Sequence, residues 1–471
     1  VHAIKLCTAD SSNTADNCTA GSVTAAAAAD ASPSPVPRAD TGHSPVFRAA
    51  ASDKSITGSD TSPGSIFGAA AGDKSITRSD TGPGSIFRSD TSHKSITRGD
   101  TSASTVAGAS SSPLACSVSR FPVCSLIQSR SILLYASVPI SPENLLVSDR
   151  ASLLLPWHRE LDALEEARLK DKQYGSTKQG IAPFYSDKYQ KKTVMAGELL
   201  HPQHLKEHLA DLLEWKNLTL QKVYGAKGYT LDELLAWVDK YCEAVKPYIT
   251  NTTAFLRDAQ KAGKSILFEA QLGALRDLDY GIYPYTTSSN SVAAYAPVGS
   301  GLPTAKLDEV VGVVKAYSSC VGEGPFVCEM FGEEGQKLRD AGAEYGAKTG
   351  RPRRVGPIDL VATRYGVEVQ GATTIALTKL DILSYMDKIP ICAHYELDGQ
   401  QTDEFPFPVC LQDAKPVIEY VDVWKCDISK VRSWDELPEN ARNYVEYVER
   451  AIGCHIGYVS VGAERDSLII R

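Results

Sequence analysis

Large aromatic side chains are confined to the later part of this 471-residue chain. All five tryptophans and all 21 tyrosines lie at or after Tyr135. Residues 1–134 contain four aromatic residues, which are Phe47, Phe67, Phe87 and Phe121. Aromatic side chains bury the most area per residue, so a segment that is poor in them has little material for a core. We therefore expect residues 138–471 to fold as a globular domain, and residues 1–134 to build no core of their own.

A twenty-residue repeat runs through residues 38–102 of this leader. The motif DKSIT begins at Asp53 and again at Asp73, and HKSIT follows at His93. Periods of this length occur in solenoid folds, which are one alternative. Each unit offers too little apolar area to offset the entropy lost on ordering it, so composition favours disorder. We predict that residues 1–134 are a low-complexity, disordered leader.

Charge and cysteine spacing argue against several classes of function. A net charge of −8 argues against a nucleic-acid surface, which needs a basic stripe to neutralise phosphates. The eleven cysteines include no CxxC pair and stand at no ligand-like histidine spacing, so neither a zinc site nor a redox pair is expected. The apolar stretch Ile132–Ile140 is far shorter than a membrane span. We expect a soluble, cytoplasmic protein with no membrane or nucleic-acid partner.

After Tyr135, apolar residues recur with the periods of helices and strands. Amphipathic helices are predicted at 158–172, at 205–213, after a Thr230–Glu233 capping box, and at 307–314. Short apolar runs predict buried strands at 266–268, 374–377 and 456–461. Strands that alternate with helices indicate an α/β fold with a largely parallel central sheet and flanking helices. Such sheets bind ligands at the carboxyl ends of their strands, which is where the polar motifs fall.

Two segments rich in glycine and hydroxyl groups are candidate phosphate sites. The first, YGSTKQGIAPFYSDKYQKK at Tyr174–Lys192, combines exposed backbone N–H groups with several lysines, although an ordinary surface loop would look similar. In the second, Ile266–Asn290, a predicted strand delivers Glu269 and Gln271 to its carboxyl end, before the hydroxyl-bearing residues 286–289. A glutamine amide there can donate to a developing oxyanion, and a Ser/Thr-rich turn is the alternative.

Two further motifs carry groups suited to anion and purine recognition. The segment Glu344–Asp359 holds Arg351, Arg353 and Arg354 between glycines, an arrangement suited to bidentate binding of carboxylates or phosphates. A solvated basic turn is the alternative. The motif ALTKLD, residues 376–381, leaves a predicted buried strand. Its aspartate can accept two hydrogen bonds from a guanine edge while the lysine stem lies along the base, although so short a match also arises by chance.

Taken together, the four motifs resemble the adenylosuccinate synthetase family in order and spacing. VGEGPF at 321–326 and SDRA at 148–151 match further segments, and the resemblance runs from about Ile140 to Arg471. It implies a fold related to the P-loop GTP-binding folds. It also implies a homodimeric enzyme of AMP biosynthesis that joins IMP and L-aspartate at the expense of GTP, with Mg²⁺, to give adenylosuccinate, GDP and phosphate. In the family, GTP phosphorylates the purine 6-oxygen, and the aspartate amine then displaces that phosphate.

The resemblance also assigns residues to the site. Those implied for IMP are Thr177, Lys191, Gln271, Thr287 and Arg351. Those implied for aspartate are Thr349 and Arg353. Those implied for GTP are Arg353, Lys379, Asp381, Ser460 and Gly462. Gln271 is the implied catalytic residue, which supports the 6-oxyanion, and Lys191 is implied to reach the IMP phosphate from the partner subunit.

Three positions depart from the commoner family pattern. Lys191 stands where arginine is usual, so a bidentate grip on phosphate becomes a single point charge. Lys348 replaces a threonine. The motif EAQLG at 269–273 moves Gln271 by one residue relative to the glycine, and such a shift on a strand turns a side chain to the other face. Either the local backbone differs from the commoner form, or Gln271 has another role.

The segment that carries much of the family's catalytic chemistry has no counterpart in this sequence. Family members open with a GDEGKGK phosphate loop that holds the catalytic aspartate, followed by a GGxNAGHT segment, and neither occurs here. The family's main Mg²⁺ ligands lie there, so no metal ligand is expected in this chain. Three hypotheses follow. The recorded amino terminus, which opens on Val1, is fragmentary or wrong; the chain is a catalytically inactive family member that binds IMP or GTP; or the repeats are an interaction segment.

Overall fold

A computed structural model of the chain describes residues 4–5, 116–118, 140–270, 272–346 and 350–471. The chain divides into two units, of which one, Asn13–Ala109, lies wholly outside the described residues. The predicted disorder of residues 1–134 therefore falls almost entirely outside the described part of the chain, and so do Gln271 and Thr349.

Helices occur along the whole segment that follows residue 140. Their bounds are α2 (Pro156–Leu169), α3 (Ile181–Tyr189), α4 (Pro202–Leu218), α5 (Leu231–Cys242), α6 (Thr252–Lys261), α7 (Tyr295–Ser300), α8 (Gly332–Ala341), α9 (Leu360–Gln370) and α10 (Glu439–Ile452). The helices predicted at 158–172 and 205–213 correspond to α2 and α4. The predicted capping box opens α5: Thr230 Oγ accepts from the Glu233 amide at 3.2 Å, and Glu233 Oε2 accepts from the Thr230 amide at 2.8 Å. Within the described ranges, no helix is both long and apolar enough to cross a bilayer.

The strands of the described residues form four sheets. Their bounds are β1 (Ile4–Lys5), β2 (Cys116–Val118), β3 (Leu146–Ser148), β4 (Ile249–Thr250), β5 (Leu267–Phe268), β6 (Val311–Lys315), β7 (Ser318–Cys320), β8 (Arg354–Gly356), β9 (Ile358–Asp359), β10 (Thr374–Thr378), β11 (Lys388–Leu397), β12 (Gln400–Thr402), β13 (Lys415–Asp422), β14 (Ile456–Ser460) and β15 (Leu468–Ile470). The orders are β4-β3-β2-β1-β5, β15-β14-β10-β6, β12-β11-β13 with β9 also beside β11, and β7-β8. Parallel runs β2-β3-β4 and β6-β10-β14, with flanking helices, confirm the predicted α/β class.

The helix predicted at 307–314 is wrong. Residues 311–315 form β6, which pairs in parallel with β10, with Val311 opposite Thr374 and Val314 opposite Leu377. Valine side chains are stiff at χ1 and fit the pleated surface of a sheet. The helical spacing of apolar residues was therefore coincidental, and pairing with β10 decides the local structure.

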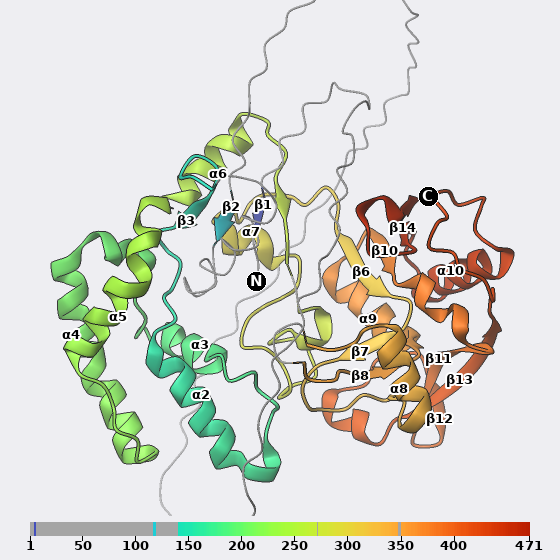
Figure 1. Ribbon diagram of the computed structural model, residues 1–471, viewed down its shortest axis with the longest axis horizontal. Coiled ribbons are helices and arrows are strands. Elements are labelled where there is room, and N and C mark those ends of the chain that lie inside the picture. The colour runs from blue at the N-terminus through green and yellow to red at the C-terminus, as the bar shows by residue number, and fades with distance from the viewer. Residues whose placement is uncertain (1–3, 6–115, 119–139, 271, 347–349) are drawn as a thin grey trace, which may run out of the picture. The chain divides into compact units, whose positions relative to one another are not determined.

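Strand β10 positions the polar motifs of the later half of the chain. It lies between β6 and β14, and all three strands run in the same direction (Figure 1). Their carboxyl ends therefore meet at one edge of the sheet. Helix α10 packs its buried face, which includes Tyr444 and Val448, into the hydrophobic core that contains β10 and β14. The Tyr444 hydroxyl donates to the Ala316 carbonyl at 2.6 Å, which attaches the helix to the segment just after β6.

A buried polar network joins α2, α3 and α4. His158 Nδ1 accepts from the Leu155 amide at 2.8 Å, and its Nε2 lies 2.8 Å from Asp187 Oδ2 and 3.2 Å from Trp157 Nε1. The other carboxylate oxygen of Asp187 accepts from Lys216. The side chains of His158, Asp187 and Lys216 are at most 4% exposed. Because burial disfavours the charged imidazolium, it lowers the pKa of His158, although Asp187 opposes the shift.

We predict that Asp187→Asn lowers the free energy of unfolding by about 3–5 kcal/mol, because Lys216 would keep a buried charge without its counter-charge. Denaturant unfolding followed by circular dichroism measures the change. Asp258→Asn is the matched control, since Asp258 and Lys261 form an exposed pair at 3.8 Å. Its removal should cost less than about 1 kcal/mol. Equal losses for the two variants would contradict the assignment.

Candidate active site

The loop around Thr177 is anchored by one buried carboxylate. Asp162 of α2 accepts from Ser176 Oγ at 2.6 Å and from the Gly180 amide at 2.7 Å. Gly180 has a φ of +84°, and a Cβ there would lie 2.6 Å from the carbonyl carbon of His158. The loop can therefore approach α2 this closely only with glycine at that position. The Thr177 side chain is exposed on this anchored loop.

A second buried carboxylate organises the segment around Thr287. Asp277 is 0% exposed; its Oδ1 accepts from the Asp279 amide at 2.9 Å, and its Oδ2 accepts from the Val292 amide at 3.2 Å. The Thr287 amide donates to the Arg276 carbonyl at 2.9 Å. These bonds fold the hydroxyl-rich turn back onto the segment that precedes it.

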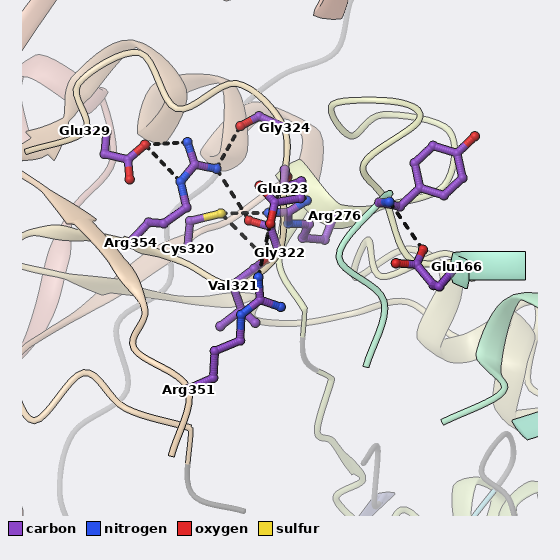
Figure 2. Close-up of polar contacts among 11 residues, drawn as sticks. Glu166, Arg276, Cys320, Val321, Gly322, Glu323, Gly324, Glu329, Arg351 and Arg354 are labelled. Atoms are coloured by element: carbon purple, nitrogen blue, oxygen red, sulfur yellow. Dashed lines mark hydrogen bonds and ion pairs between the residues drawn. The ribbon is translucent and has the colours of Figure 1, made fainter. Parts of the chain in front are cut away.

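The loop Val321–Gly324 is held through its backbone by two arginines (Figure 2). Arg276 donates to the Val321 carbonyl at 2.8 Å, and Arg354 donates to the Gly324 carbonyl at 2.7 Å. Arg354 also donates from Nε to Glu329 Oε2 at 2.9 Å, which fixes the guanidinium that holds the loop. Since guanidinium groups offer several donors in one plane, each arginine can bind the loop and a second group at once.

The same loop contacts two other predicted motifs. The Glu323 amide donates to the Tyr174 carbonyl at 3.4 Å, and the Glu323 carboxylate pairs with Arg351 at 3.1 Å. Tyr174 opens the segment that carries Thr177, and its amide donates to Glu166 of α2 at 3.2 Å. The loop therefore connects the first predicted phosphate segment with the arginine cluster.

Glu344 is a buried carboxylate that receives donors from three directions. Its side chain is 0% exposed, and its Oε1 accepts from Lys315 Nζ and from the Tyr317 hydroxyl, each at 2.6 Å. Its Oε2 accepts from Arg353 at 2.6 Å. Lys379 Nζ lies 4.0 Å from Oε1. Glu344 thus joins the carboxyl end of β6, the residue that follows β10, and the arginine cluster.

Electrostatics keep this group charged. Burial by itself raises the pKa of Glu344. Hydrogen bonds from Lys315, Tyr317 and Arg353 together outweigh burial and lower the pKa from its usual 4.5 to about 2. Arg353 also lines a large cavity, and its Nε is buried without a hydrogen-bond partner among the described residues. Buried polar groups normally have partners, so this unused donor indicates a site for an anionic or carbonyl acceptor.

The structure places the four residues expected to read guanine at one edge of the sheet. Lys379 and Asp381 follow β10, and Ser460 and Gly462 lie at the end of its parallel neighbour β14. Lys379 has a φ of +61°, and its Nζ donates to the Gly342 carbonyl at 2.6 Å. Burial raises the pKa of Asp381, and Lys379 opposes that shift. Ser460 Oγ donates to the Gly462 carbonyl at 2.9 Å.

The cavity has a volume of about 2750 Å³ and brings together Thr177, Thr287 and Arg353. Small-molecule sites usually occupy roughly 300–1,000 Å³, so this volume suits several substrates at once. Of the predicted site residues that the structure describes, the cavity lining does not include Lys191, Arg351, Lys379, Asp381, Ser460 and Gly462. Lys191 is exposed and follows α3, with a φ of +64°.

The groups that hold the loops were not predicted as site residues. Arg276, Glu323 and Glu344 lie within the matched motifs and Asp162 lies in the predicted helix 158–172, but nothing in their local sequence distinguishes them from ordinary surface charges. The one available signal was the position of Arg276, between the predicted strand and the hydroxyl-rich turn. Burial is the property that separates such residues, and spacing does not report it.

The parallel strands β6, β10 and β14 carry cationic and hydroxyl-bearing loops at their carboxyl ends, and a large cavity lies beside the sheet. This arrangement is that of a nucleotide-binding α/β protein. The comparisons with known proteins specify the family. A family model described as adenylosuccinate synthetase matches residues 123–469. The chain belongs to the adenylosuccinate synthetase family. By family it is an enzyme, a GTP-dependent ligase of purine biosynthesis.

Individual relatives agree with the family model. The adenylosuccinate synthetase of Caldanaerobacter subterraneus subsp. tengcongensis is 41% identical over 334 residues, which are 71% of this chain and 78% of that protein. The adenylosuccinate synthetase of Streptococcus sanguinis is 43% identical over 328 residues, 69% of this chain and 76% of that protein. The structure of fully ligated adenylosuccinate synthetase from Plasmodium falciparum matches with a TM-score of 0.69 and 32% identity, covering 74% of this chain and 82% of that chain.

We predict that Glu344 makes stability depend on pH below neutrality. Its pKa in the folded protein, about 2, lies below its usual value of 4.5, so its contribution is present above pH 4.5 and is lost as the pH falls towards 2. The full contribution is about 3 kcal/mol, of which about 1 kcal/mol should disappear between pH 5.5 and 3.5. Urea unfolding at both pH values measures it.

Glu344→Gln should flatten this pH dependence. Glu333→Gln is the control, because Glu333 forms an exposed pair with Lys337 at 2.8 Å. The assignment is contradicted if Glu344→Gln loses as much stability between pH 5.5 and 3.5 as the unchanged chain does.

Proposed function

We propose that this chain recognises IMP, L-aspartate and GTP and belongs to an enzyme that converts them to adenylosuccinate, GDP and phosphate. In this proposal GTP phosphorylates the purine 6-oxygen of IMP, and the aspartate amine then displaces that phosphate. The observation that carries the proposal is the cavity that unites Thr177, Thr287 and Arg353, three residues drawn from separate motifs of one family.

The IMP phosphate is assigned to the anchored loops. Thr177 and Thr287 offer hydroxyl donors, and their loops are fixed beforehand by Asp162 and Asp277. Preordered donors bind an anion without a further entropic cost of ordering the loop. Arg351 is assigned to the ribose of IMP. Its pairing with Glu323 at 3.1 Å supports this, because the pair holds an exposed side chain beside the Thr177 loop.

The carboxylates of aspartate are assigned to Arg353 and Thr349. Arg353 donates one N–H to Glu344, while its Nε has no partner within the described part of the chain. An arginine that is fixed at one side can offer the other side to a carboxylate. We also assign Arg353 to the GTP site, since it lines the cavity and lies in the same charge network as Lys379.

Guanine is assigned to Lys379 and Asp381, with Ser460 and Gly462 at the neighbouring strand. Asp381 is partly buried, and a partly desolvated carboxylate binds two donors of a guanine edge more strongly than an exposed one does. The adjacent position of β10 and β14 supports this grouping.

A homodimer is proposed from Lys191. This lysine is exposed and does not belong to the cavity lining of its own chain within the residues described, so it is available to a partner subunit. We propose that it reaches the IMP phosphate there, as a point charge where the family commonly has arginine. We also propose a cytoplasmic location.

Magnesium does not fit the carboxylates that lie beside the arginine cluster. Mg²⁺ prefers carboxylate and water oxygens in octahedral geometry. Glu323 is paired with Arg351, and Glu344 is saturated by Lys315, Tyr317 and Arg353. No step is assigned to the ion in this chain. Magnesium dependence remains a proposal based on the family.

A second candidate function is nucleotide binding without efficient turnover. The sequence contains no GDEGKGK loop and no GGxNAGHT segment, which in the family supply the catalytic aspartate and a histidine at the transferring phosphate. Gln271, the remaining candidate for the 6-oxyanion, lies outside the described residues. We propose that the 471-residue chain by itself is incomplete or impaired as a catalyst although it binds its substrates.

Binding and turnover measurements on the purified chain distinguish these two functions. We expect IMP and GTP to bind, with formation of adenylosuccinate close to background when IMP, aspartate and GTP are all present. Binding is measured by calorimetry and turnover by chromatography of the products. Robust turnover would contradict the second proposal. Failure to bind both nucleotides, by a chain shown to be folded by circular dichroism, would contradict the first.

We predict that Asp381→Asn weakens GTP binding by about 10–100-fold and changes IMP binding less than about twofold, since hydrogen bonds to a charged group are worth roughly 1.5–3 kcal/mol. Asp387→Asn is the control, because Asp387 lies on the surface and pairs with Lys425 at 2.6 Å. Calorimetric titration with each nucleotide measures both affinities. Comparable losses for IMP and GTP would rule out the guanine assignment.

A further inference from the structure

Glu198, His204 and His208 form a convergent cluster away from the lining of the cavity. Glu198 lies in a short 3-10 helix, Ala196–Leu200, and the two histidines lie on α4. His208 Nδ1 is 2.7 Å from Glu198 Oε2, and His204 Nε2 is 3.5 Å from the same oxygen. All three potential ligand atoms lie within 4.8 Å of one another.

The local structure orients all three side chains towards one point. Residues four apart share a helix face, so His204 and His208 project side by side, and Lys206, two positions from each, points elsewhere. Glu198 Oε1 accepts from the Met195 amide at 2.7 Å, which leaves Oε2 directed at the histidines. Glu198 and His208 are 15% and 27% exposed, and His204 is 66% exposed. The cluster is therefore fixed on one side and open to solvent on the other.

The spacing suits a tetrahedral transition-metal ion. Ligand atoms about 2.0–2.1 Å from a tetrahedral Zn²⁺ lie about 3.3 Å from one another. The two separations from Glu198 Oε2, 2.7 and 3.5 Å, lie on either side of that value, and the two histidine nitrogens lie within 4.8 Å of each other. Two imidazoles and one carboxylate are ligands that zinc accepts, with a water in the fourth position.

A surface ion pair is the simpler alternative. It needs one histidine and one carboxylate oxygen, and it gives no reason for a second imidazole nitrogen to approach the same oxygen. From the convergence of three ligand atoms, we infer that Glu198, His204 and His208 bind a divalent transition-metal ion of the zinc class. The bound ion ties the 3-10 helix to α4.

Zn²⁺ titration of the full 471-residue chain, with a chromophoric chelator as competitor, tests this inference. We expect one equivalent bound at neutral pH, and at least a tenfold loss of affinity in His204→Gln, His208→Gln and Glu198→Gln. Glu198→Gln keeps an oxygen that can accept from the Met195 amide, so it removes the ligand charge with little effect on the turn. His455→Gln is the control, since His455 is exposed and lies beside a single carboxylate, Glu449. It should bind Zn²⁺ as the unchanged chain does.

Thermal unfolding gives a second readout. Ligands that bind the folded state raise its melting temperature, so Zn²⁺ should raise the Tm of the unchanged chain and of His455→Gln, but not that of His204→Gln or His208→Gln. If all variants bind Zn²⁺ equally, the metal is held elsewhere, for example by the exposed thiol of Cys426, and the inference is wrong. If the unchanged chain binds no Zn²⁺, the cluster is an ion pair only.

Discussion

The carboxylate of Glu344 receives hydrogen bonds from Lys315, Tyr317 and Arg353, which are 29, 27 and 9 residues away in the sequence. A buried carboxylate costs several kcal/mol unless it is paired and hydrogen-bonded. The end of β6, the turn at Glu344 and the arginine cluster must therefore reach their positions together. Because β6 pairs with β10, the constraint extends to the residues that follow β10. Glu344 thus fixes Lys315, Tyr317 and Arg353, all three of which line the cavity.

Two more buried carboxylates act in the same way on shorter segments. Asp162 holds the loop of Thr177 against α2, and Asp277 folds the turn that carries Thr287. Both oxygens of each carboxylate accept hydrogen bonds from the protein. Their effect is to fix loops before a ligand arrives, which reduces the entropy lost on binding. The loops that carry Thr177 and Thr287 are thus held in place by the protein itself, whereas the family's GDEGKGK phosphate loop does not occur in the sequence.

Much of the fold could be predicted from periodicity and capping, because these are local. The helices α2, α4 and α5, and the strands β10 and β14, follow from apolar spacing and from the Thr230–Glu233 box. Strand β6 was missed, because Leu307, Val310, Val311 and Val314 satisfy a helical spacing until a neighbouring strand is known. Local motifs also located the loops of the site.

What could not be predicted depends on partners far away in the chain. Glu344 and Arg276 derive their importance from burial and from contacts 27 to 45 residues distant. Likewise, no metal site was predicted, because the cysteines show no ligand-like spacing and the family's main Mg²⁺ ligands lie in a segment with no counterpart here. The pair of His204 and His208 gains a third ligand only because the turn before α4 brings Glu198 back beside it.

The contacts that hold the loop Val321–Gly324 do not depend on the side chains of the loop. Arg276 and Arg354 bind its carbonyl oxygens, which every residue type possesses. These two contacts therefore place no restriction on the residue types within the loop. In divergent relatives, the two arginines should identify the position of the loop better than the sequence of the loop itself does.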